Sequence, residues 1–270
     1  MKIIVFVIVI YKPCISELED ILKTLKGKNV VLVDNSERND DKVIHQELAR
    51  NLNVKLIPTN QNIGYPAGAN IGISYALSKN TEWVITLTPD LTISKKQIDN
   101  YCSKISRLEP CLAGPLGGGL DRKRWTTIFS MNYSKTVDYL SGGFLSIHRE
   151  VINRIGYLFN PFFMYYEDVD YSIRARKAGF RLVKIPIVDM KHNDSPVLGK
   201  ESFLHQYYHA RNHLLFVERQ APLNVKLREY IRLPKTLFDH YSNKEIGALR
   251  GVIDYIFRQF GQRKNYENRS

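Results

Sequence analysis

Three acidic side chains, Glu167, Asp168 and Asp170, crowd into four consecutive positions of the stretch MYYEDVDYSIRARKAGF, residues 164–180. The stretch has an apolar stripe at helical spacing, basic residues near its end and Gly179 as a stop, so it predicts a helix with an acidic first turn. The helix dipole favours acids in that turn but does not require three of them. Glu167 and Asp168 are neighbours and cannot share one helix face, so one of them is free to act as a general base in a crevice.

Asp90 follows an apolar run in TLTPDLT, residues 86–92, and is a candidate ligand for a divalent cation. A carboxylate in such a place can bind a cation that bridges the oxygens of a diphosphate, and hard oxygen ligands suit Mg²⁺ or Mn²⁺. The alternative is that Asp90 caps the helix that follows, a role that Thr92 or Ser94 could also serve. His192 follows a later strand. A lone loop histidine is most often a hydrogen-bonded surface residue, but beside Asp90 it would complete a metal site.

A glycine-rich stretch, NQNIGYPAGANIG at residues 60–72, leads into another predicted helix. Its glycines would let backbone amides approach an anionic ligand at the start of that helix. The candidate ligand-binding residues in this stretch are Asn62, Gly64, Gly68 and Asn70. Their spacing, and their position after the third predicted strand rather than the first, differ from a dinucleotide-binding fingerprint, which argues against a dehydrogenase.

Four more candidates, Tyr11, Asp34, Asn35 and Thr88, come directly after or at the ends of predicted strands. At the carboxyl end of a parallel strand, Asp34 can accept a hydrogen bond from a nucleobase N–H group or a ribose hydroxyl. It can equally cap a turn within the protein. Both roles stay open for Asp34 from the residues alone.

The first hundred residues alternate strand and helix signals that would bring these side chains together. Strand-like runs occupy residues 3–10, 29–36, 54–59 and 83–90, and helix-like runs occupy residues 16–27, 41–52 and 68–79. We expect Ser16 to cap the first of these helices. The alternation predicts right-handed βαβ units, and hence an α/β fold with a mainly parallel central sheet flanked by helices. Ligand-binding groups of such sheets gather at the carboxyl ends of the strands.

The middle and the end of the chain have a different character. GPLGGGLDRKRW, residues 114–125, predicts a mobile loop near a site, or a plain surface linker. After a further strand-like run, the composition shifts to helices rich in His, Arg and aromatic residues. We place this boundary near residues 195–200, which gives a ligand-binding and catalytic domain at 1–198 and a basic helical region at 199–270 with a frayed tail.

The composition narrows the class of protein. A chain of 270 residues can form one α/β domain with a small appendage. The three cysteines include no C-x-x-C pair, which disfavours disulfide bonds and zinc and fits a reducing compartment. The N-terminal apolar run is too short to cross a bilayer and lacks a cleavage site, so we expect a soluble or peripheral protein.

The formal net charge of +12 predicts an anionic partner: nucleic acid, a phosphorylated ligand or a lipid surface. From Lys200 onward there are 13 Lys and Arg against 7 Asp and Glu, so half of the excess lies in the helical region. A solvated helical face would explain this equally well. The sequence has no helix-turn-helix, zinc or RNP pattern, and we therefore expect no nucleic-acid partner.

The order of the motifs resembles family 2 glycosyltransferases with the GT-A fold. DNS, N-x-G-x-x-x-G-x-N-x-G, x-P-D, SGGFL, FFMYYEDVD and then a histidine follow one another over residues 3–217. The stretches NIGYPAGANIG, SGGFLSIHRE, FFMYYEDVDYSIRARKAGF and YYHARN are most similar to bacterial rhamnosyltransferases of polysaccharide and O-antigen assembly. Each motif is modest by itself, but their order is specific.

The resemblance implies an inverting transfer of a sugar from a nucleotide-sugar donor to a glycan hydroxyl. Asp168 falls where the family has its catalytic base, with Glu167 beside it. Asp34 would contact the pyrimidine, next to Asn35, and Tyr11 would lie on the same donor side. The asparagines and glycines of residues 62–70 would shape the nucleotide side.

The resemblance also implies a divalent cation, Mg²⁺ or Mn²⁺. Asp90 corresponds to the metal-binding last acid of the family's D-x-D motif, and His192 to the histidine that assists at the metal or the diphosphate. Thr88 stands where the family usually has Asp, or Asn in this branch, and this departure bears on ribose contact and on the strength of metal binding.

The resemblance favours dTDP-rhamnose as the donor, with UDP-galactofuranose or another UDP-hexose as the alternative, and a lipid-linked bacterial polysaccharide precursor as the acceptor. We then expect an enzyme in the bacterial cytoplasm, peripheral on the inner face of the cell membrane, with its basic helices against anionic lipid. The alternatives are a nucleotide-sugar-binding protein without turnover, suggested by Thr88, and a nucleic-acid-binding module, suggested by charge alone.

Overall fold

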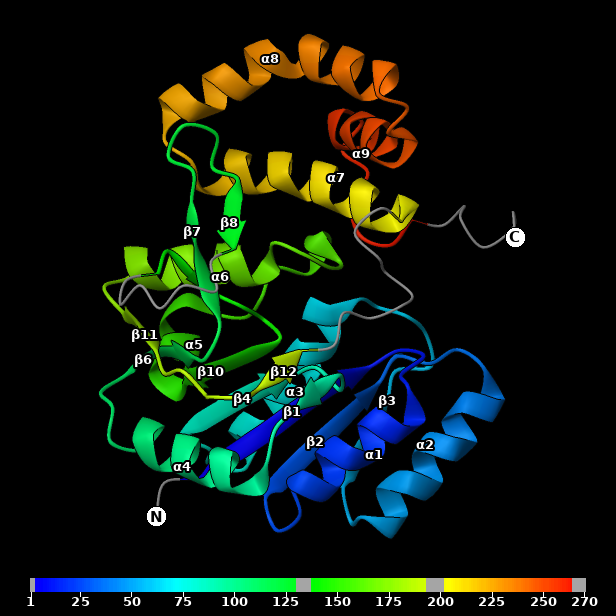
Figure 1. Ribbon diagram of the computed structural model, residues 1–270, viewed down its shortest axis with the longest axis vertical. Helices are drawn as coiled ribbons and strands as arrows, with labels where there is room; N and C mark the ends of the chain where they lie inside the picture. The colour runs from blue at the N-terminus through cyan, green and yellow to red at the C-terminus, as the bar shows by residue number, and fades with distance from the viewer. Residues whose placement is uncertain (1–2, 130–136, 193–201, 264–270) are drawn as a thin grey trace.

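A seven-stranded sheet forms the centre of the molecule in the computed structural model, which describes residues 3–129, 137–192 and 202–263 (Figure 1). Its strands, in chain order, are β1 (Ile4–Ile10), β2 (Asn29–Asp34), β3 (Lys55–Pro58), β4 (Trp83–Leu87), β6 (Cys111–Gly114), β10 (Phe144–His148) and β11 (Arg181–Lys184). Their order across the sheet is β11-β6-β10-β4-β1-β2-β3. β10 runs antiparallel to both neighbours and the other neighbouring pairs are parallel, which confirms the predicted α/β fold.

Helices cover both faces of this sheet. One face carries α1 (Ile15–Thr24), α2 (Asn39–Asn51) and α4 (Lys95–Ile105), and the other carries α3 (Tyr65–Ser78), α5 (Arg149–Ile155) and α6 (Glu167–Lys177). The central strand β1 shows why, because its successive side chains point to opposite faces and all of them are apolar. Phe6 and Ile8 pack under the first group of helices, and Val5 and Val7 under the second.

The start of the first helix differs from the prediction. α1 begins at Ile15, and Cys14 occupies the N-cap position without a capping hydrogen bond from its side chain. The hydroxyl of Ser16 lies 3.2 Å from the Cys14 sulfur. Ser16 is thus already inside the helix, and its prediction as the cap was wrong.

Two small sheets flank the central one. β5 (Leu91–Thr92) pairs with β12 (Lys191–His192), and β7 (Gly117–Leu120) pairs with β8 (Thr127–Phe129) and β9 (Tyr139–Leu140). The glycines predicted to form a mobile loop or linker therefore form a strand. A Cβ atom on Gly117 would lie 2.4 Å from the Tyr139 carbonyl oxygen, so these glycines serve the close approach of neighbouring strands.

Three helices, α7 (Phe203–Gln220), α8 (Leu223–Ser242) and α9 (Ile246–Ile256), form the C-terminal part of the described chain. Figure 1 shows α8 arched along the outside, with α7 and α9 beneath it. α7 and α9 approach so closely that a Cβ atom on Gly251 would lie 2.3 Å from the Tyr207 carbonyl oxygen. The predicted boundary at residues 195–200 lies outside the described residues.

One apolar cluster joins these helices to the part of the molecule that contains the central sheet. It includes Tyr166, Val169 and Ile173 around α6, and Leu214 and Phe216 of α7. In the described parts of the chain, no helix combines the length and the apolar character needed to cross a membrane.

Candidate active site

Glu167 and Asp168 open α6 directly after a strained turn. Phe163, Tyr165 and Tyr166 have φ angles of 66°, 63° and 71°, a left-handed conformation that bulky residues rarely adopt. Such strain persists only where surrounding contacts enforce it, and it is concentrated at functional sites. Here it turns the chain so that two acids stand at the N-terminus of a helix.

The contacts that enforce this turn come from α7. The buried side-chain amide of Asn212 donates hydrogen bonds to the carbonyl oxygens of Phe162, Met164 and Tyr165, at 2.8, 2.6 and 3.0 Å. The neighbouring Arg211 donates to the Phe162 oxygen at 2.9 Å. One asparagine thus holds three carbonyl groups of the turn and fixes the path of the chain into α6.

Asp168 is tied to a glycine loop between β9 and β10. Its Oδ2 accepts a hydrogen bond from the backbone N–H of Gly142 at 2.7 Å, and its Oδ1 accepts one from Val169 N–H at 2.8 Å. Burial raises the pKa of the Asp168 carboxyl, and these backbone donors oppose the rise. The carboxylate is therefore oriented, and it is more basic than an exposed aspartate.

Glu167 is the buried partner of Asp168. It is 6% exposed, and its Oε2 has no hydrogen-bond partner among the described residues. Burial, followed by the negative charge of Asp168, raises the pKa of Glu167. Because more backbone N–H groups bond to the Asp168 carboxylate than to that of Glu167, the pair favours a proton on Glu167 and the charge on Asp168.

Asp170 has a structural role. It is completely buried and accepts hydrogen bonds from Arg174 at 2.8 Å, Arg219 at 3.0 Å and Gln220 at 2.7 Å. These contacts join α6 to the end of α7. The three crowded acids therefore occupy three separate environments.

Thr88 lies beside the same glycine loop, two residues before Asp90. Both residues follow β4 and are partly buried, and the Thr88 N–H donates to the Gly143 carbonyl oxygen at 3.1 Å. Ser94 caps α4 in a reciprocal capping box with Gln97, so the alternative role of Asp90 as the cap of that helix is wrong. Asp90 is therefore not needed as the cap of α4.

Tyr65, the first residue of α3, contacts the glycine loop that holds Asp168. Its hydroxyl donates to the Gly142 carbonyl oxygen at 2.8 Å. Burial raises the pKa of the Tyr65 phenol, and the charges of Glu167, Asp168 and Asp90 raise it further. All three carboxylates thus act on one phenol at one edge of the sheet.

Sequence reasoning missed Tyr65 and Gly142 as site residues. Both lie inside stretches with recognisable patterns, NIGYP and SGGF, and these patterns could have identified them as candidate site residues. The sequence does not predict the contact between Tyr65 and Gly142, because these residues are 77 positions apart.

The glycine-rich stretch packs against both the sheet and the strained turn. Gly64 has φ 83°, and a Cβ atom on it would lie 2.5 Å from the Phe163 carbonyl oxygen. Asn62 accepts the Gly64 N–H at 3.1 Å, and a Cβ atom on Gly68 would lie 2.7 Å from a methyl of Val9. Asn70 donates to the Leu158 carbonyl oxygen at 2.8 Å, before the short 3-10 helix η1 (Asn160–Phe162). Binding of the donor by these residues stays a prediction.

The ends of β1 and β2 are held by internal bonds. Asp34 is 1% exposed; its Oδ2 lies 3.0 Å from His45 Nδ1, and its Oδ1 accepts from Ser36 N–H at 2.8 Å. Burial opposes ionisation of Asp34, but the bonds to His45 and Ser36 hold its pKa below the usual range. Asn35 donates to the Gly64 carbonyl oxygen at 3.1 Å. These bonds support the turn role of Asp34, and its contact with a nucleobase stays a prediction.

Tyr11 follows the end of β1 and is partly exposed, with the Lys12 ammonium 5.2 Å from its ring centre. This places an aromatic ring and a cation together at the carboxyl end of the central strand. Its predicted contact with the donor stays a prediction.

The predicted metal ligands are neighbours along the backbone. β12 pairs with β5 so that His192 lies opposite Leu91, the residue after Asp90. Among the described residues, no group of three His, Cys, Asp or Glu side chains is arranged to hold a metal ion. Mg²⁺ needs only one or two protein carboxylates when substrate phosphates and water complete its shell, so an Asp90 oxygen at the strand end fits this requirement.

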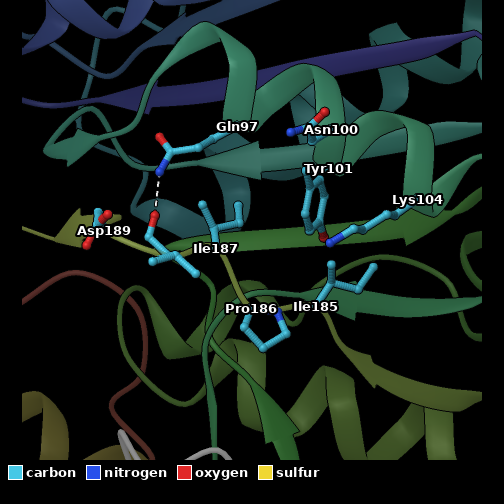
Figure 2. A pocket seen from close by; sticks show the side chains of 9 residues that line it. Gln97, Asn100, Tyr101, Lys104, Ile185, Pro186, Ile187 and Asp189 are labelled. Carbon is cyan, nitrogen blue, oxygen red and sulfur yellow. Dashed lines mark hydrogen bonds between the residues drawn. The ribbon is translucent and has the colours of Figure 1, made fainter.

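A separate pocket of about 270 Å³ lies on the other side of β5, between α4 and residues 185–189 (Figure 2). Figure 2 shows Gln97 reaching across one end to the Val188 carbonyl oxygen, and Tyr101 and Lys104 along its wall. None of the predicted site residues lines this pocket.

Comparisons with known proteins agree with this geometry. The family model for glycosyl transferase family 2 matches residues 6–169. The chain is 26% identical over 258 residues to the N-acetylglucosaminyl-diphospho-decaprenol L-rhamnosyltransferase of Mycobacterium tuberculosis, covering 78% of this chain and 83% of that protein. It is 27% identical over 252 residues to the dTDP-rhamnosyl transferase RfbF of Shigella flexneri, covering 83% of each.

A solved structure shares the fold. The mannosyltransferase PcManGT from Pyrobaculum calidifontis, in complex with GDP-Man and Mn²⁺, superposes with a TM-score of 0.58 at 11% identity, covering 95% of this chain and 87% of that one. The topology of the sheet, the carboxylates at its edge and the match to the family model all point to the same family. The chain belongs to glycosyl transferase family 2 and has the GT-A fold.

Proposed function

We propose that this glycosyltransferase moves rhamnose, with inversion, from dTDP-rhamnose to a hydroxyl of a lipid-linked bacterial glycan. The names of two relatives support the sugar and the kind of acceptor: one is a dTDP-rhamnosyl transferase, and the other is an L-rhamnosyltransferase named for a diphospho-decaprenol compound. The observation that carries the proposal is the Asp168 carboxylate at the start of α6, which the backbone N–H groups of Gly142 and Val169 hold in place.

Asp168 would act as the general base. A sugar hydroxyl is a poor nucleophile near neutral pH, so a carboxylate must take its proton as the new bond forms. The Gly142 N–H fixes one oxygen of Asp168, and burial makes the carboxylate more basic. The protonated Glu167 would keep a second negative charge away from the acceptor hydroxyl. The leaving nucleotide diphosphate needs no proton, so one base is sufficient.

Asp90, with His192, would hold a divalent cation. The cation would offset the charge that develops on the departing diphosphate. The likeness to a structure that contains Mn²⁺ supports this cofactor. Thr88, Asn62 and the backbone around Gly64 would surround the nucleotide.

The test is transfer by the purified chain from a panel of donors, dTDP-rhamnose, UDP-galactofuranose and other UDP-hexoses, with and without Mn²⁺. We expect turnover with dTDP-rhamnose, and in Asp168→Asn a fall in kcat of about 10²- to 10⁴-fold with donor affinity retained. Asp40→Asn, an exposed acid of α2, is the matched control and should behave as wild type. Full turnover by Asp168→Asn would remove the base assigned here.

A second function, binding of a nucleotide sugar without turnover, is favoured by Thr88. Its side chain and N–H both face the Gly143 carbonyl oxygen, and it supplies a hydroxyl where the family usually has a carboxylate. A donor that raises the melting temperature without being consumed, at equal background rates in wild type and Asp168→Asn, would support this alternative. A UDP-hexose that is transferred in preference to dTDP-rhamnose would change the donor and keep the mechanism.

The place of action follows from the proposed acceptor. An enzyme that extends a lipid-linked precursor with a nucleotide sugar would work in the bacterial cytoplasm, at the inner face of the cell membrane. The excess of positive charge supports contact with an anionic surface.

A further inference from the structure

The outer face of α8 is an apolar stripe. Five large side chains on this helix are between 51% and 80% exposed: Leu223, Leu227, Ile231, Phe238 and Tyr241. Their spacing of three, four or seven residues places them on one side of the helix over its whole length. Pro234, also exposed, lies in the middle of the same side. We call these five residues the α8 stripe.

The fold itself uses the opposite side of α8. Val225 is buried, and Leu233 and Leu237 pack against the cluster that joins α7 and α9 to α6. The helix is therefore apolar on two sides, and only one of them is needed for folding. A contiguous exposed apolar surface on a charged protein marks a site of interaction.

Basic residues gather beside the start of the α8 stripe. The turn between β7 and β8 carries Arg122, Lys123 and Arg124, all exposed, and Figure 1 shows this hairpin reaching the first turns of α8. Arg228 of α8 donates to the Lys123 carbonyl oxygen at 2.8 Å. His213 of α7 lies 3.0 Å from the Arg124 carbonyl oxygen. We call Arg122, Lys123 and Arg124 the basic turn.

Positive charges lie near one another along α8 and the basic turn, although Arg122 is also paired with the carboxylate of Asp138. Burial lowers the pKa of His213, and the positive charges of Arg124 and Arg232 contribute to the fall. Burial also lowers the pKa of Lys177, with a contribution from Lys226 of α8. An anionic partner would relieve this repulsion, which gives the stripe a charge preference as well as an apolar one.

We propose that the α8 stripe and the basic turn form a docking surface for an anionic phospholipid bilayer. The stripe would enter the boundary between headgroups and acyl chains, and the basic turn would contact lipid phosphates. A second copy of the chain packed on the stripe is the competing occupant, and the experiment below distinguishes it from a bilayer. This surface depends on the proposed function only for its purpose, which is to bring the site to a lipid-linked acceptor.

The surface has a direct mechanical connection to the active site. α8 packs on α7 through the shared apolar cluster, and Asn212 of α7 holds the turn that leads to Glu167 and Asp168. Docking of α8 would therefore set the orientation of these acids relative to the bilayer.

The experiment is flotation of the full chain with vesicles of phosphatidylcholine, with or without phosphatidylglycerol. We expect binding to the anionic vesicles at low salt, and a loss of about tenfold or more in partitioning for the double variant Ile231→Asp/Phe238→Asp. The control, Val43→Asp/Ile44→Asp, makes the same charge change on two exposed apolar residues of α2 and should bind as wild type. Both wild-type residues of the tested pair are exposed, so both variants should fold.

The outcomes separate this inference from the proposed function. Wild type that fails to float, or equal flotation of both double variants, would overturn the docking surface. So would a concentration-dependent dimer, seen by sedimentation, that the α8 substitutions alone disrupt. Donor turnover is measured on the same samples with a soluble acceptor. Flotation with no turnover would sink the proposed function and leave the surface standing, and turnover without flotation would do the reverse.

Discussion

Asp168 and Glu167 are adjacent along the chain but differ in what surrounds their oxygens. Asp168 accepts two backbone N–H bonds, whereas one oxygen of Glu167 is buried without a partner among the described residues. The difference decides which of the two carries the charge near neutral pH. The sequence could predict that the pair lies at a helix start, but not which oxygen meets Gly142, because that donor comes from a loop 26 positions away.

The raised pKa of Asp168 predicts the pH dependence of transfer. The base must be ionised, so kcat should fall as the pH drops through the folded-state pKa, which lies above the value of about 4 for an ordinary aspartate. We expect the acid limb of kcat against pH to lie above that value, and Asp168→Asn to lose the limb together with its activity. Fluorescence of Trp83 and Trp125, recorded at each pH, controls for unfolding. A limb near pH 4 in wild type would contradict the environment described for this carboxyl.

At the scale of elements, α7 and the strained turn act as one unit. The predictions of a helix with an acidic first turn within residues 164–180, of helices in the C-terminal region and of the early strands are correct, because the helices follow apolar spacing or composition and the strands are continuous apolar runs. Residues 117–120 were misread as loop, although residues 121–126 do form a turn, because glycine in a strand and glycine in a loop look alike until the neighbouring backbone is known. The role of Asn212 could not be predicted from the sequence either. A single asparagine within a helix gives no pattern that indicates which carbonyl groups its side chain will contact.

Asn212→Ala tests whether the hydrogen bonds from α7 hold the strained turn at residues 163–166 in place. The carbonyl oxygens of Met164 and Tyr165 would lose the Asn212 donor, and that of Phe162 would keep only its other donors, so the free energy of unfolding should fall by about 1–3 kcal/mol. We also expect kcat to fall by about tenfold to hundredfold while donor affinity holds, because the base would be misplaced. Gln220→Ala is the comparator on the same helix: it removes a buried amide that contacts Asp170 instead of the turn. Equal kcat in the two variants, at a temperature where both are folded, would reduce Asn212 to a purely stabilising role.

At the scale of the whole molecule, the C-terminal helices and the sheet share a core. Tyr166, Val169 and Ile173 around α6 pack in one cluster with residues of α7, α8 and α9. The two halves placed on either side of residue 198 by sequence reasoning are thus in extensive apolar contact among the described residues. The amino-acid composition changes near residue 198. Composition alone, however, could not predict that the two regions bury apolar side chains against each other.

The two tryptophans allow this shared core to be tested. Trp83 is buried in the central sheet, and Trp125 stacks near Phe216 of α7, with 5.7 Å between ring centres. We expect Trp83→Phe and Trp125→Phe, each with one remaining tryptophan, to show single unfolding transitions in guanidinium chloride that coincide with circular dichroism of the same variant. Fluorescence that changes before or after the loss of helix would instead show two independent units.

The hydrogen bonds of Asn212 also decide how this protein can be recombined with its relatives. A chimera that imports foreign C-terminal helices to change the acceptor would keep the native loop at residues 161–166 but present it with a new set of donors. Transferring that loop together with α7 preserves the match, whereas a crossover between them breaks it. The segment exchanged in such a chimera should therefore begin before Pro161, inside the region that matches the family model. It should not begin at the change in composition near residue 198.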